Sequence, residues 1–151
     1  MNRVRLHHNL TLPNDVNTIP QLNEFLDVFC EEAGIDMETT MSLNLAMEEA
    51  VVNVMDYAYP AGTEGSVNIE ALAGDNSVTF IITDNGIPFD PTAKEGVDTT
   101  LPVEERPIGG LGILLIRKIM DEVKYERNEN KNILTLTKKF NSKSNTNILP
   151  L

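Results

Sequence analysis

The sequence has a single cysteine, few basic residues and no long apolar run, and each shortage excludes a class of protein. Cys30 alone cannot form an internal disulfide, so the chain is not a disulfide scaffold. No apolar stretch is long enough to span a bilayer, and no secretory signal follows Met1. We therefore expect a cytoplasmic protein that does not bind membranes.

Basic residues are outnumbered by acidic ones, with 12 Lys and Arg against 23 Asp and Glu and a formal charge of −11. This acid excess repels the phosphate backbone of nucleic acids and the surface of anionic membranes, so neither is an expected direct partner. A small phosphorylated ligand is still compatible with the charge, because backbone N–H groups and a metal ion can bind phosphate without Lys or Arg.

The 151 residues are enough for one hydrophobic core and leave little room for a second domain. We expect one domain over residues 1–140 and a polar, disordered tail over 141–151. Apolar periodicity predicts strands over 3–12, 67–72, 78–82, 123–128 and 133–140, and helices over 19–33, 37–58 and 111–120. Their order predicts a two-layer α/β (α+β) sandwich, in which three helices cover one face of a mixed, mostly antiparallel sheet.

Several residues are expected to begin or end the helices. Thr18 followed by Gln21 has the capping-box pattern, Gly34 is a typical helix stop, and Asp36 can cap the second helix. The segment 85–108 contains four prolines and little periodicity. An irregular segment of this length inside a small domain is typical of a functional lid.

One polar stripe is expected on the second helix. Glu49, Asn53 and Tyr57 follow at i, i+4 and i+8 and therefore share a helix face. Carboxylate and amide oxygens suit Mg²⁺, and a carboxylate beside that metal can accept a proton from a hydroxyl nucleophile. The alternative interpretation is a solvated polar face.

A second candidate site lies at the end of an apolar strand. Asp84 is followed by Asn85-Gly86, which is the usual signal of a hairpin turn. Pro88 and Pro91 follow at once, and prolines cannot donate a full ladder of hydrogen bonds to a partner strand. A carboxylate fixed at a strand end beside a glycine suits the exocyclic amine of a flat base.

A glycine-rich segment, residues 109–113, directly precedes the third helix. Such a helix start can present backbone N–H groups and a favourable dipole to phosphate oxygens. The segment matches neither the Walker A sequence nor the G-x-G-x-x-G fingerprint. A flexible hinge or a tight helix–sheet contact is the alternative interpretation.

In this order the three motifs resemble the sequence boxes of the Bergerat-fold ATPases, the superfamily of gyrase, the histidine kinases and MutL. The resemblance covers roughly residues 9–140, and it is closest to the small anti-sigma-factor serine kinases. It rests on residues 46–53, on Asp84-Asn85-Gly86-Ile87-Pro88-Phe89-Asp90-Pro91, and on residues 109–123.

The resemblance implies an ATP-dependent serine/threonine protein kinase that phosphorylates an antagonist protein, sequesters a sigma factor, or does both. It implies that Glu49 is the general base, that Asn53 binds Mg²⁺, and that Asp84 accepts a hydrogen bond from the adenine amine. It also implies an ATP lid over 89–107 and pairing of two copies of the chain. The other implied nucleotide-binding residues are Gly86, Pro88, Gly109, Gly110, Leu111, Gly112 and Ile113.

One position departs from the family pattern. Some members carry an Arg just before the glycines of the third motif, where it reaches the γ-phosphate, but here that residue is Ile108. The nearest arginine is Arg106, so either it acts from the lid or γ-phosphate activation is weak. Two alternatives therefore stand beside the kinase: a non-catalytic, nucleotide-gated protein-binding switch, and a structural α/β protein with coincidental glycines.

Overall fold

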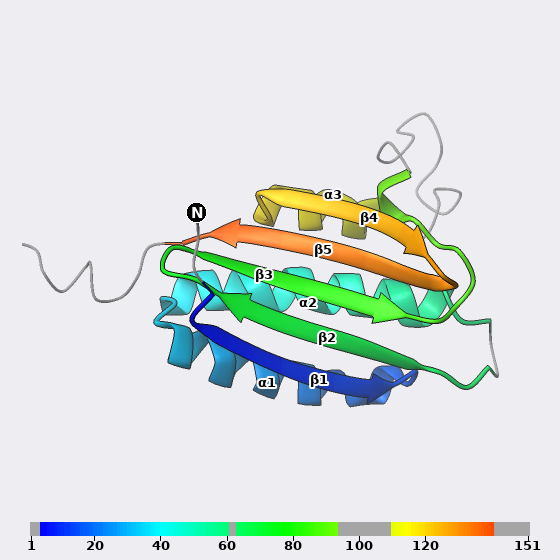
Figure 1. Cartoon of the computed structure of the whole chain (residues 1–151), viewed down its shortest axis with the longest axis horizontal. Helices are drawn as coiled ribbons and strands as arrows, with labels where there is room; N and C mark the ends of the chain where they lie inside the picture. Colours follow the sequence, from blue (N-terminus) through cyan, green and yellow to red (C-terminus); the bar gives the residue numbers. More distant parts are fainter. Residues whose placement is uncertain (1–3, 61–62, 94–109, 141–151) are drawn as a thin grey trace, which may run out of the picture.

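Five strands lie side by side in one sheet in the order β1-β2-β3-β5-β4, and every neighbouring pair is antiparallel (Figure 1). In this computed structural model the described residues are 4–60, 63–93 and 110–140, so the predicted tail and most of the predicted lid lie outside them. The strands are β1 (Leu6–Pro13), β2 (Ser66–Ala73), β3 (Ser77–Asp84), β4 (Glu122–Asn128) and β5 (Lys131–Lys139).

Three α-helices cover one face of the sheet: α1 (Ile19–Ala33), α2 (Met37–Tyr57) and α3 (Gly110–Ile119). The helix α2 lies between the other two and contacts both. The predicted two-layer α/β sandwich is therefore confirmed. The described sheet is antiparallel throughout, because β5 inserts between β3 and β4, the two strands that run in the same direction. Among the described residues, none of the helices has the length and apolar character needed to cross a membrane.

Local hydrogen bonding explains where the helices begin and end. Gly34 ends α1 in the left-handed conformation with φ 78°, and the Asp36 side chain caps α2 by accepting from the Thr39 N–H at 3.1 Å. The predicted capping box at Thr18 is wrong, because a 3₁₀ turn (Val16–Thr18) precedes α1. Asp15 caps that turn, and the Thr18 hydroxyl donates to the Asp15 carbonyl at 2.6 Å instead of capping the helix.

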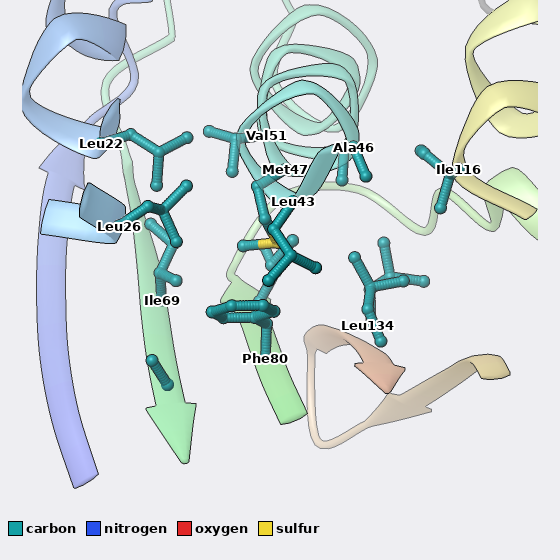
Figure 2. Packing of buried hydrophobic residues seen from close by; sticks show 14 of the residues in the cluster. Leu22, Leu26, Leu43, Ala46, Met47, Val51, Ile69, Phe80, Ile116 and Leu134 are labelled. Carbon is teal, nitrogen blue, oxygen red and sulfur yellow. The ribbon is translucent and has the colours of Figure 1, made fainter. Parts of the chain in front are cut away.

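The hydrophobic core lies between the sheet and the helix layer (Figure 2). Alternate residues of β2 and β3 face the helices, and Phe80 at the centre of β3 is fully buried. Its ring packs edge-on against Phe29 of α1, with 6.1 Å between the ring centroids. Figure 2 labels core residues from all three helices and three strands: Leu22, Leu26, Leu43, Ala46, Met47, Val51, Ile69, Phe80, Ile116 and Leu134.

Replacing Phe80 by Ala should lower the free energy of unfolding by about 3–5 kcal/mol, because it leaves a cavity where the sheet meets two helices. Urea denaturation followed by circular dichroism measures the loss. Val28, which is 54% exposed on α1, is the control, and Val28→Ala should change stability by less than about 0.5 kcal/mol. Equal losses in the two variants would contradict this account of the core.

Candidate active site

The first and third predicted motifs meet where α3 begins against α2. Glu49 is half-buried and Asn53 is 7% exposed, and the two lie one helical turn apart. A Cβ atom at Gly112 would lie 2.8 Å from Glu49 Oε2 and 3.1 Å from Asn53 Nδ2. Glycine at position 112 therefore lets the α3 backbone approach both polar side chains.

Both of these polar side chains are free to interact with a ligand. Neither Glu49 nor Asn53 makes a hydrogen bond or ion pair with another described residue. No fully buried side-chain N or O atom of the described residues lacks a hydrogen-bond partner, so the Asn53 amide atoms are accessible to water or to a ligand. No cluster of three or more His, Cys, Asp or Glu among the described residues could hold a metal ion. A cation bound by Asn53 would therefore depend on ligand oxygens or water for its remaining coordination.

The second motif fixes a carboxylate at the end of β3. Asp84 is 3% exposed, and its Oδ1 accepts hydrogen bonds from the Gly86 N–H at 2.8 Å and from Asn132 Nδ2 at 2.9 Å. Its Oδ2 has no hydrogen-bond partner among the described residues and can accept from a ligand. Burial raises the pKa of Asp84, while the two hydrogen bonds and the charge of Arg127 oppose that rise.

Asn132 holds Asp84 in place, and the sequence analysis missed it. It lies opposite Asp84 in the β3–β5 register and is 3% exposed. Besides Asp84, its Nδ2 donates to the Ile87 carbonyl at 2.8 Å, and its Oδ1 accepts from the Phe89 N–H at 3.2 Å and from the Tyr125 hydroxyl. All four hydrogen bonds of the amide are thus made. One sequence feature could have indicated a buried role for Asn132. It is a polar residue that shares its alternation with Leu134 and Leu136, the apolar residues of β5 that face the core.

The loop after β3 is held against the end of α2. A Cβ atom at Gly86 would lie 2.2 Å from the Ala58 carbonyl oxygen, and the Ile87 N–H donates to that oxygen at 2.8 Å. Glycine at position 86 is therefore required by this backbone contact, independently of any ligand. The Tyr57 ring stacks on Phe89, with 5.5 Å between their centroids. These contacts give Tyr57 a packing role at the start of the predicted lid.

The helix α2 thus brings together the three motifs. Glu49 and Asn53 in its C-terminal half lie beside the start of α3, and Ala58 at its end contacts the loop that follows Asp84. Asn53 and Ala58 are separated by five residues, or about 7.5 Å of helix rise. One ligand could therefore reach both places, with a hydrogen-bond donor at Asp84 and an anionic group at the start of α3.

The remaining predicted site residues differ in how they could contribute. Gly109, Arg106 and Ile108 lie outside the described residues, whereas Gly110 and Leu111 lie in the first turn of α3. The Ile113 side chain is 2% exposed in the core, so only its backbone could serve a ligand. Pro88 is exposed beside Gly86.

The N-terminal histidines take no part in this site. His7 contacts Glu70 and His8 contacts Glu32, so the two imidazoles have different partners and do not form a joint metal site. This agrees with their positions as neighbours in a strand, which place the two side chains on opposite faces.

The fold and motifs define a histidine kinase-like ATPase domain, and the family model of that description matches residues 12–138. Serine-protein kinase RsbW of Listeria monocytogenes is 31% identical over 122 residues, which cover 78% of this chain and 77% of that protein. RsbW of Halalkalibacterium halodurans is 29% identical over 132 residues, covering 80% of each protein. The chain belongs to the anti-sigma-factor serine-protein kinase family of the histidine kinase-like ATPases.

A solved structure shows the same fold. The RsbU and RsbW domains of a Mycobacterium tuberculosis protein superpose with a TM-score of 0.64 and 19% sequence identity. The match covers 90% of this chain and 33% of that longer chain. At this level of identity the likeness concerns the fold alone.

Replacing Asn132 by Ala should lower the free energy of unfolding by about 2–3 kcal/mol, because it leaves Asp84 and its neighbouring backbone groups buried without their partner. Tyr125→Phe removes one hydrogen bond of the same network and should cost about 1 kcal/mol. Asn128, exposed in the same hairpin, is the control, and Asn128→Ala should be nearly neutral. Chemical denaturation measures all three, and a neutral Asn132→Ala would contradict the network's role.

Proposed function

We propose that this chain is an ATP-dependent serine/threonine protein kinase and anti-sigma factor, which phosphorylates an antagonist protein, sequesters a sigma factor, or does both. The observation that carries the proposal is the close approach of Gly112 to Glu49 and Asn53, because it joins a glycine-rich helix start to a carboxylate and an amide. The relatives described above, which are named serine-protein kinases, support the same activity.

In this proposal the site binds ATP along α2. Asp84 Oδ2 accepts from the adenine amine, and Gly86 and Pro88 line the base. The backbone N–H groups of residues 109–113 bind the phosphates at the start of α3. Asn53 Oδ1 is the protein ligand of Mg²⁺, which when bound neutralises phosphate charge during transfer.

Glu49 is the general base of the proposed reaction. Its carboxylate accepts the proton of a partner's Ser or Thr hydroxyl as that oxygen attacks the γ-phosphorus and ADP leaves. The nucleotide site involves all three motifs of this domain, so the phosphorylated residue is placed on another protein. The cytoplasm as its location and the pairing of two copies remain predictions from the sequence.

A second function, a nucleotide-gated switch without catalysis, is favoured by one observation. Ile108 stands where some family members carry the arginine that reaches the γ-phosphate. In that case ATP would bind and change a protein contact without transferring its phosphate. Because Glu49 would then be dispensable, its substitution separates the two functions.

Glu49→Gln should lower phosphate transfer from labelled ATP to an antagonist protein by at least about 100-fold, because no group then accepts the hydroxyl proton. The affinity for Mg-ATP, measured by calorimetry, should change little. Glu48→Gln is the matched control: Glu48 is the neighbouring acid and accepts from Asn23 at 3.2 Å, away from α3, so this variant should keep its activity. A wild-type chain that binds ATP and transfers no label to any partner would favour the switch.

Asp84→Asn should weaken ATP binding at least about tenfold, because a charge-assisted acceptor for the adenine amine is lost. Calorimetry measures the affinity, and an unchanged ATP affinity would contradict the adenine assignment.

The same variant should also change how stability depends on pH. Burial raises the folded pKa of Asp84 above its ordinary value of 3.8, so the ionised carboxylate costs stability that the protonated form does not. That cost develops as the pH rises through the folded pKa. Relative to wild type, the variant should therefore gain stability as the pH rises above 3.8, as thermal unfolding measures.

A further inference from the structure

A groove of about 800 Å³ lies between the N-terminal half of α2, the C-terminal half of α3 and the end of β5. Its apolar lining residues are Leu45, Leu115, Ile119 and Phe140. Thr39 in this groove and Asn53 at the proposed nucleotide site are 14 residues apart on α2, or about 21 Å. The lining residues of the groove do not include Glu49, Asn53 or Gly112, although Leu45 lies one helical turn before Glu49 on α2.

The charge of this groove is opposite to that of the chain as a whole. Lys118, Lys138 and Lys139 line it together with only two acids, Asp36 and Glu38, although acids outnumber bases 23 to 12 in the sequence. None of the three lysines forms an ion pair with a described residue. The Asp36 carboxylate is already engaged in capping α2. The groove therefore offers three lysines without ion-pair partners among the described residues, beside an apolar surface.

Lys138 is well placed to act in this groove. It shares the alternation of the buried Leu134 and Leu136 on β5, so its side chain lies on the face of the sheet that the helices cover. Lys118 lies on α3, across the groove from α2. A partner seated on the apolar lining would therefore have a cation on each of two elements within reach.

The apolar surface continues out of the groove along α2. Met37 and Met41 are 77% and 67% exposed, and they precede Leu45 at successive i, i+4 steps. Methionine side chains are flexible and are over-used on surfaces that bind helices of varied sequence. An apolar groove extended by such a row suits the recognition of an amphipathic helix through i, i+3 and i+4 anchors.

We propose that this groove is the docking site for an acidic amphipathic helix of a partner protein. The apolar stripe of that helix packs on Leu45, Leu115 and Ile119, and its Asp and Glu side chains pair with Lys118 and Lys138. The helix α3 begins at the proposed nucleotide site and ends in this groove, so it physically connects the two.

The experiment uses a synthetic peptide of about 18 residues, five helical turns, with Leu on one helix face and Glu on both flanks. Its binding to the nucleotide-free chain is measured by fluorescence anisotropy with an uncharged dye. The double variant Lys118→Glu/Lys138→Glu should bind the peptide at least about tenfold more weakly. The control Lys124→Glu/Lys131→Glu makes the same change in net charge on β4 and the far end of β5, and should change affinity by less than about threefold.

Methyl spectra of methionine-labelled chain locate the peptide. The signals of Met37 and Met41 should shift on binding, while Met55, buried near the other end of α2, should not. Three results would each overturn the proposal: equal weakening in the two double variants, equally tight binding of a peptide with scrambled Leu positions, or no shift of Met37 and Met41. Because nucleotide is absent throughout, none of these results bears on the kinase assignment.

Discussion

The packing of α2 against the centre of the sheet is the contact on which the rest of the structure depends. One side of this helix buries Leu43, Met47 and their neighbours over Phe80, and α1 and α3 then pack on its two flanks. Burial of this apolar side fixes the rotation of the helix, because a turn about its axis would expose the core. That rotation directs Glu49 and Asn53 toward the start of α3. Core packing therefore orients the polar groups of the proposed site.

The Asp84 end of the site depends on polar groups that folding must remove from water. Asp84 and Asn132 are both almost completely buried, and burial raises the pKa of the carboxyl group. Asn132 reduces this cost by giving Asp84 a hydrogen bond, and it also joins β5 to the loop that leads to Phe89. The Asp84 carboxylate therefore costs folding stability, while its Oδ2, which has no partner among the described residues, can accept a hydrogen bond from a ligand. Stability and the proposed nucleotide binding therefore make opposite demands on this residue.

The helix pair α2–α3 joins two surfaces of different character. At one end, Gly112 allows the start of α3 to contact a carboxylate and an amide on α2. At the other end, the same two helices and the end of β5 line a groove that contains apolar side chains and three lysines. The ten-residue helix α3 spans the distance between these two surfaces. The helix α3 is therefore the element shared by the proposed nucleotide site and the proposed docking groove.

The sequence by itself determined the elements, their order and the three motifs, because apolar periodicity, the Gly34 stop and the Asp36 cap all act within a few residues. It also indicated that Asp84 and the Glu49–Asn53 pair belong to one site, through the resemblance to a known family. Only the tertiary structure showed that Asn132 supports Asp84, that Gly86 must pass the Ala58 carbonyl, and that β5 inserts between β3 and β4. These features depend on cross-strand register and on the space left for a Cβ atom between segments far apart in the chain, which no local pattern encodes.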